Sequence, residues 1–279
     1  IYKINHIKER HNMEEAKILK MIDNNPNIIS TINNPTNEMK LLAVKKNGLV
    51  LAHIENPSIE IQETAIKNNI RAIKYIENPS EDMMIKAINS GWSLLDYIKN
   101  PTEKVFKLAL NQSGWAIQYI KNPSEELQLL AVEKDYDSIK YIKNPCESAQ
   151  IEAVKANYGA LKYINSPTYE AQAIAIKQNE AAITFITDLD KDKMLAFLKI
   201  NILVIKYIAR EISEYELEEI LKQVLSTEDV EEKYVRDFLN CNIIDRNSEN
   251  FKMDKIMFIY KYASKTAKKI AVDEKLKMI

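Results

Sequence analysis

Apolar and polar positions recur along most of the chain with a period of twenty-two residues. Seven prolines mark the period: Pro35, Pro57, Pro79, Pro101, Pro123, Pro145 and Pro167. When each proline is numbered position one, position nine is always alanine and position ten is always aliphatic, and larger apolar residues often precede them. This spacing is typical of an amphipathic helix. A fixed period of this length predicts a stacked repeat array.

Each unit opens with signals that start a helix. Six of the prolines follow Asn, Ser166 precedes the seventh, and acidic residues follow at once. Asn and Ser side chains cap free backbone N–H groups, proline suits the first helical position, and the helix dipole favours negative charge there. We therefore expect the residue before proline to be the N-cap. A cap on the residue after proline, such as Ser58 or Thr102, would move the start by two residues.

Asn and Gly residues predict where this first helix ends. All four glycines lie at positions thirteen to fifteen, and Asn occupies position thirteen in four units: Asn47, Asn69, Asn157 and Asn179. Both residue types tolerate the left-handed backbone that ends many helices. We therefore interpret them as helix terminators.

A second, shorter helix fills the rest of the unit. Positions seventeen and twenty are always Ile or Leu, and position nineteen is Tyr in five units: Tyr75, Tyr97, Tyr119, Tyr141 and Tyr163. A helix of about seven residues is unstable alone, so it must pack against its partner helix and the next unit. We expect the alanines to be buried where neighbouring helices touch, and the Tyr row to pack in the core beside Ile.

The pattern predicts an all-α fold, an α-solenoid of about nine 22-residue two-helix repeats with a helical C-terminal cap. Counting back from Pro35 places a unit at Met13, and counting forward from Pro167 places one at Leu189. We therefore expect an α-helical repeat array over residues 1–210, with its regular units from 13 to 210.

Residues 211–279 are expected to form the cap. A capping box, Ser213 with Glu216, opens a helix to about Leu225. Two further helices are expected, one from Thr227 to about residue 240 and one from about 252 to 271. Residues 211–249 hold four basic and twelve acidic residues, whereas 250–279 hold eight basic and three acidic, so the two stretches could pair with each other.

The repeat motif resembles a known family. The motif consists of Asn-Pro-(Ser/Thr)-x-Glu followed by Ala-Val-Lys-x-Asn-Gly-x-Ala-(Ile/Leu)-x-Tyr-Ile. It is clear at residues 122–126 and 115–120. It is similar to a 22-residue repeat domain of unknown function found in bacteria and large viruses, and the resemblance covers residues 13–210. It implies the fold and carries no catalytic residues over to this chain.

Composition narrows the class of protein. Apolar residues make up 46% of the chain, enough for a buried core, and the formal net charge of −1 gives no case for a nucleic-acid or membrane partner. We find no run of eighteen apolar residues and no secretory signal, and so expect no membrane partner. Cys146 and Cys241 are far apart and match no ligand spacing, which favours a reducing, cytoplasmic location.

The sequence offers no set of catalytic, metal-ligating or cofactor-binding residues. His6 and His11 are five residues apart with no cysteine or carboxylate set to complete a zinc site, and His53 stands where other units have Tyr, which indicates packing. All four glycines are assigned to helix ends, so no phosphate-binding loop remains. We therefore expect a protein that is not an enzyme, with no cofactor and no small-molecule substrate.

Two sets of residues are candidates for partner binding. Position eighteen is polar and variable, as on a recognition surface or an idle solvent face. Aromatic residues open several second helices, where they could anchor an interface or fill the space between units. The candidate partner-binding residues are Lys74, Trp92, Asp96, Trp115, Gln118, Tyr136, Lys140, Tyr158, Lys162 and Lys206.

We expect a non-catalytic scaffold or adaptor that binds another protein through an extended surface. One version is an inhibitor that docks on a larger protein or ribonucleoprotein machine in phage–host conflict, as the occurrence of the family in viruses suggests. The alternative is nucleic-acid binding along a lysine row formed by position eighteen with Lys99, Lys121 and Lys143. An enzyme is the remote third possibility.

Overall fold

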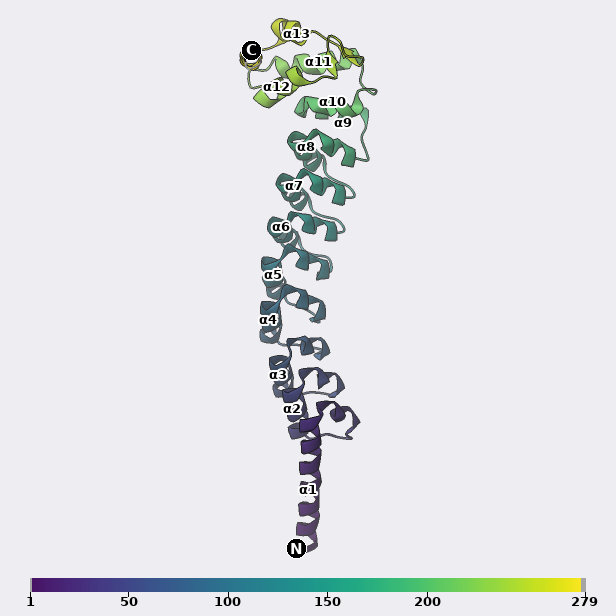
Figure 1. Cartoon of the computed structure of the whole chain (residues 1–279), viewed down its shortest axis with the longest axis vertical. Coiled ribbons are helices and arrows are strands. Elements are labelled where there is room, and N and C mark those ends of the chain that lie inside the picture. The colour runs from purple at the N-terminus through teal and green to yellow at the C-terminus, as the bar shows by residue number, and fades with distance from the viewer. Residues whose placement is uncertain (1, 277–279) are drawn as a thin grey trace. The chain divides into compact units, whose positions relative to one another are not determined.

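The structure, a computed structural model, describes the backbone of residues 2–276 and the side chains of residues 13–276. The side chains of His6 and His11 therefore lie outside the described residues. The chain divides into two compact units, residues 1–135 and 136–279. In both units α-helices alternate with 3₁₀-helices, labelled η, in regular two-helix repeats (Figure 1). The predicted all-α solenoid is confirmed.

The first unit contains an N-terminal helix and the repeats that follow it. Each α-helix of a regular repeat has ten residues and each 3₁₀-helix has six. The elements are α1 (Tyr2–Asn24), η1 (Pro26–Thr31), α2 (Asn37–Lys46), η2 (Gly48–His53), α3 (Ile59–Asn68), η3 (Ile70–Tyr75), α4 (Glu81–Ser90), η4 (Trp92–Tyr97), α5 (Glu103–Gln112), η5 (Gly114–Tyr119) and α6 (Glu125–Lys134). The unit counted back to Met13 is in register, because η1 occupies the same positions as the other 3₁₀-helices, but its first helix, α1, begins well before Met13.

The second unit continues the alternation and then changes to longer helices. The repeat elements are η6 (Tyr136–Tyr141), α7 (Glu147–Ala156), η7 (Tyr158–Tyr163), α8 (Tyr169–Gln178), η8 (Glu180–Phe185), α9 (Lys191–Ile200), η9 (Ile202–Val204) and α10 (Ile205–Ile208). The remaining elements are α11 (Glu214–Leu225), α12 (Glu232–Asn240), β1 (Ile244–Asp245), β2 (Phe251–Lys252), α13 (Lys255–Tyr262) and α14 (Lys265–Leu276). The predicted division into array and cap at residue 210 stays a prediction.

The α-helices begin two residues later than the first expectation. Their N-caps are the residues after proline: the Oγ1 of Thr36, for example, accepts a hydrogen bond of 3.3 Å from the N–H of Met39. At four of the six Asn-Pro sites of the proline-marked repeats the Asn instead takes a left-handed backbone, with φ between 45° and 52°: Asn34, Asn56, Asn100 and Asn122. The following proline disfavours the right-handed helical region, and Asn tolerates the left-handed one.

The predicted helix ends at position thirteen are confirmed, because the C-caps of five α-helices are Asn47, Asn69, Gly91, Asn157 and Asn179. The expectation of a left-handed backbone at these helix ends is wrong. At Asn47 the backbone is extended, with φ −148°, and none of the four glycines is left-handed. The side chain of Asn47 also caps the next helix, because its Oδ1 accepts from the N–H of Leu49 at 3.1 Å. Asn69, Asn157 and Asn179 cap their 3₁₀-helices in the same way.

The core lies between the α-helical and 3₁₀-helical layers of each unit. All seven alanines at position nine are fully buried, and positions ten, seventeen and twenty are buried in every proline-marked repeat. Each buried Ile or Leu stabilises the fold by roughly 1.5–3 kcal/mol relative to an exposed one. This part of the prediction is confirmed.

Side-chain amides also join consecutive repeats. Each amide lies at the end of one α-helix and donates a hydrogen bond to a carbonyl at the end of the preceding α-helix. The last carbonyls of an α-helix have no hydrogen-bond partner within that helix. The Nδ2 or Nε2 to oxygen pairs are Asn68–Lys45, Gln112–Ile88, Gln178–Lys155 and Asn201–Ile176, at 2.7 to 2.9 Å.

The C-terminal elements match the sequence in part. The capping box of Ser213 and Glu216 and the helix it opens are confirmed. The next helix begins at Glu232 rather than at Thr227, and the expected last helix is two helices. It breaks because the N–H of Ser264 bonds the carbonyl of Leu225 at 2.8 Å while its Oγ caps α14. A short parallel pairing of β1 with β2 was not expected.

Candidate interaction surface

The 3₁₀-helices present their polar residues outward. A 3₁₀-helix has three residues per turn, so side chains three apart align. Positions seventeen and twenty share the buried line, and position eighteen points to solvent. The candidates at position eighteen are all exposed, as predicted: Lys74, Asp96 and Gln118 in the first unit, and Lys140, Lys162 and Lys206 in the second.

The Tyr row lies at the surface, and the prediction that it packs in the core is wrong. Tyr75, Tyr97, Tyr141 and Tyr163 are 37% to 40% exposed. Position nineteen is the last residue of each of these 3₁₀-helices, and its ring is partly exposed although position sixteen, one turn before it, is buried in every proline-marked repeat. His53, at the same position of its repeat, is also exposed, so its expected packing role is wrong.

In the first unit a lysine links two rings of this row. The Nζ of Lys74 lies 4.7 Å from the ring centroid of Tyr75 and 6.0 Å from that of Tyr97 in the next repeat. Cations at such distances are attracted to the electron-rich ring face, by roughly 0.5–1 kcal/mol at an exposed site. Lysine and tyrosine therefore form one patch across η3 and η4.

Trp92 and Trp115 differ in their surroundings. The half-buried ring of Trp92 contacts that of Tyr119 at 6.2 Å between centroids, which agrees with filling the space between η4 and η5. Trp115 is 40% exposed, and its carbonyl accepts a hydrogen bond of 2.9 Å from Nε2 of Gln118. Asp96 is exposed nearby on η4 and adds a negative charge to this face.

The second unit repeats the lysine–tyrosine arrangement. Lys140 lies 5.1 Å from the ring centroid of Tyr141, and Lys162 lies 4.6 Å from that of Tyr163. Lys140 also pairs with Asp137 at 2.8 Å, and the hydrogen bond raises the pKa of the lysine. The basic charge of this repeat is therefore partly compensated.

The remaining candidates of the second unit contact neighbouring residues or are half-buried, which leaves them less available to a partner. The hydroxyl of Tyr136 accepts a hydrogen bond of 3.2 Å from Nδ2 of Asn157, and Tyr158 is half-buried. Lys206 pairs with Glu180 at 2.9 Å, and this hydrogen bond raises the pKa of Lys206. The residue adds little free positive charge to the surface.

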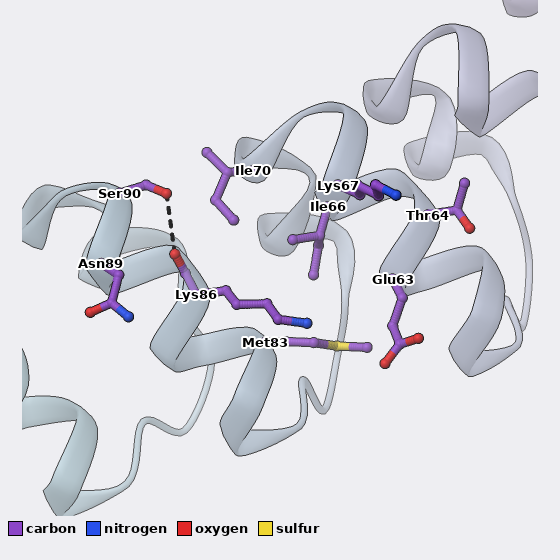
Figure 2. A pocket seen from close by; sticks show the side chains of 9 residues that line it. All are labelled: Glu63, Thr64, Ile66, Lys67, Ile70, Met83, Lys86, Asn89 and Ser90. Carbon is purple, nitrogen blue, oxygen red and sulfur yellow. Dashed lines mark hydrogen bonds between the residues drawn. The ribbon is translucent and has the colours of Figure 1, made fainter.

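A hollow between two repeats of the first unit does not gather polar groups. A hollow of about 560 Å³ lies between α3 and α4, and Ile70, Met83 and Ile66 contribute to its lining. Figure 2 shows Asn89 turned away from Lys67, and the Oγ of Ser90 bonded to the carbonyl of Lys86. The polar groups face different directions, whereas catalysis needs groups that converge on one point.

The described part of the chain carries no candidate metal site and no candidate membrane span. Among these residues, no group of three or more His, Cys, Asp or Glu side chains could hold a metal ion. Within residues 2–276, no helix combines the length and apolar character needed to span a bilayer. Neither Cys146 nor Cys241 forms a disulfide with a described residue.

Comparison with known proteins adds no relative. No family model, no curated protein and no solved structure matches the chain. The resemblance to the 22-residue repeat family therefore stays a prediction from the motif.

Proposed function

We propose that the chain is a non-catalytic scaffold that binds another protein, in the cytoplasm, through the exposed face of its 3₁₀-helices. The observation that carries the proposal is the exposure of the Tyr row beside a polar, variable position eighteen. Tyr supplies a large contact area with few rotatable bonds, and it is enriched among residues that dominate binding energy. Variation at position eighteen on a constant frame is how a repeat array sets its specificity.

The rigidity of the frame supports this proposal. Position nine alanines, buried Ile lines and cross-repeat amides fix the spacing of consecutive 3₁₀-helices within a unit. A surface that is ordered before binding loses little entropy on association. One version of the function is an inhibitor or adaptor that docks on a larger protein or ribonucleoprotein machine.

Site-specific photo-crosslinking in the native host tests the proposal. A photoreactive side chain at Asp96 lies on the 3₁₀ face of the first unit, and the same side chain at Asn111 lies on the exposed face of α5 as a matched control. We expect protein adducts from position 96 and few from position 111. Adducts from 111 alone, or adducts that nuclease removes, would contradict the proposal.

Nucleic-acid binding is the second candidate, and the lysine–tyrosine pairs favour it. Exposed aromatic rings can stack on bases while lysines contact phosphates. The positive charge of this lysine row is only partly uncompensated, however. Lys121 and Lys143 are exposed, whereas Lys99 pairs with Glu77 and Lys140 pairs with Asp137. Acidic partners on the same face reduce the attraction for a phosphate backbone.

A salt titration separates the two candidates. If single-stranded RNA binds here, Lys162→Gln should weaken binding and lower the slope of log affinity against log salt by about one. Lys155→Gln, an exposed lysine on α7, is the matched control. Equal effects of the two substitutions, or no binding at low salt, would exclude nucleic acid as the partner of this face.

A further inference from the structure

The last two helices of the second unit leave an apolar groove on its surface. The groove has a volume of about 340 Å³. Its apolar lining comes from α13 and α14: Ile256, Ile259, Tyr260, Ala271, Val272 and Leu276. Tyr260, Val272 and Leu276 are 73%, 58% and 63% exposed, although such side chains are normally covered in a folded domain. Contiguous exposed apolar residues of this kind mark a binding surface.

Two lysines line the groove, and neither forms an ion pair with an acidic residue in the described part of the chain. Lys268 and Lys275 line it, and Lys261 and Lys269 lie on the same two helices. None of these four lysines forms an ion pair with a described residue. Lys268 instead lies 5.9 Å from the ring centroid of Tyr260 at the groove. The rim is therefore positively charged and free to pair with carboxylates.

The acidic residues around these helices are engaged elsewhere. Glu274 is bonded to Arg236 and to Asn240, and Glu228 accepts hydrogen bonds from the N-terminal N–H groups of α14. Asp254 caps α13 through the N–H of Met257. Asp273 is exposed but does not line the groove. The expected pairing of the acidic and basic C-terminal stretches therefore does not neutralise these lysines.

We propose that this groove binds an amphipathic helix of a partner protein, with its apolar face in the groove and carboxylates along its flanks. A hollow between two helices accepts a ridge of side chains from a third helix, with apolar anchors three and four residues apart. The lysine rim selects acidic flanks by charge complementarity. A lipid bilayer, the other surface that attracts lysines beside apolar residues, offers no such ridge to fill a hollow.

Binding of model helices to the full chain tests the inference. The probe is a peptide of Leu and Glu with all Leu on one helical face. Its counterpart replaces every Glu with Lys, and vesicles containing phosphatidylserine are the third arm. We expect saturable binding of the Glu peptide only, and weaker binding as salt increases. Preferential binding of the Lys peptide, or binding of vesicles without the Glu peptide, would overturn the proposal.

Substitutions on α14 locate the site. Val272→Glu puts a charge into the groove and should weaken binding of the Glu peptide at least about tenfold. Lys275→Gln should weaken it several-fold, whereas Lys269→Gln makes the same change on the same helix outside the groove and should have no effect. All three positions are exposed, so the fold should survive the changes. Equal affinities for the variants and the parent chain would refute the groove as the binding site.

Discussion

Two glycines in the first unit allow neighbouring repeats to approach each other, and Gly114→Ala tests this directly. A Cβ on Gly114 would lie 2.1 Å from the carbonyl oxygen of Ala131 in the next repeat, where ordinary contact begins at 3.4 Å. The N–H of Gly114 also donates a hydrogen bond of 2.7 Å to the carboxylate of Asp135. Gly48 has the same arrangement, with a Cβ distance of 2.3 Å to the carbonyl oxygen of Ala65.

The expected loss has two parts. The added methyl group meets backbone, which cannot rotate away, so α6 must move back by about 1.3 Å or η5 must distort, at a cost of roughly 1–3 kcal/mol. Moving α6 also weakens the bond to Asp135, and hydrogen bonds to charged groups contribute about 1.5–3 kcal/mol. We expect Gly114→Ala to lower the free energy of unfolding by about 2–4 kcal/mol.

Gly91→Ala is the matched control. A Cβ there has no atom within 4 Å, and the backbone is extended, with φ 160°. Alanine restricts the unfolded chain, so this change should stabilise the protein by about 0.4–1 kcal/mol. Urea unfolding followed by circular dichroism measures both. Opposite shifts of the midpoint are expected, and shifts of the same sign and size would refute the close-approach argument.

Three further predictions address the cap and the frame. The hydrogen bond from Lys191, together with those from Ser213, lowers the pKa of Glu216 to about 2 from 4.5. Because its carboxylate form is favoured in the folded state, Glu216→Gln should destabilise at neutral pH, and the difference in melting temperature should vanish as pH falls from 4.5 to 2. Ala109→Leu should cost roughly 1–3 kcal/mol by overpacking, whereas Gln118→Ala should change the urea midpoint little. Asn201→Ala should cost roughly 1–3 kcal/mol, because a buried carbonyl loses its partner; an unchanged unfolding midpoint would contradict this.

The sequence predicts the repeat frame because burial there follows side-chain identity. Position nine alanines and the Ile at position twenty recur without exception, and both are buried. The Tyr row was assigned wrongly because each Tyr directly precedes a buried Ile in the sequence. In the structure Tyr97 is the last residue of η4 and Ile98 is its C-cap with an extended backbone, so the helical period does not relate the two side chains.

The break between α13 and α14 was missed for a different reason. The segment from 252 to 271 has a helical pattern throughout, and nothing local stops it. It ends at Tyr262 because Ser264 bonds the end of α11, which is far away in the sequence. The groove between the two helices depends on this break, so no periodicity in the sequence indicates it.

The residue at position fourteen controls how closely consecutive α-helices of the first unit pack. Where it is Gly48 or Gly114, the next helix approaches so closely that a single Cβ would collide with its backbone. Where it is Ile70, the side chain stands between α3 and α4 and lines the hollow of about 560 Å³ (Figure 2). The hollow therefore follows from a bulky residue at a position where two other repeats of this unit carry glycine and one carries Trp92. This origin in packing explains why its polar groups do not converge.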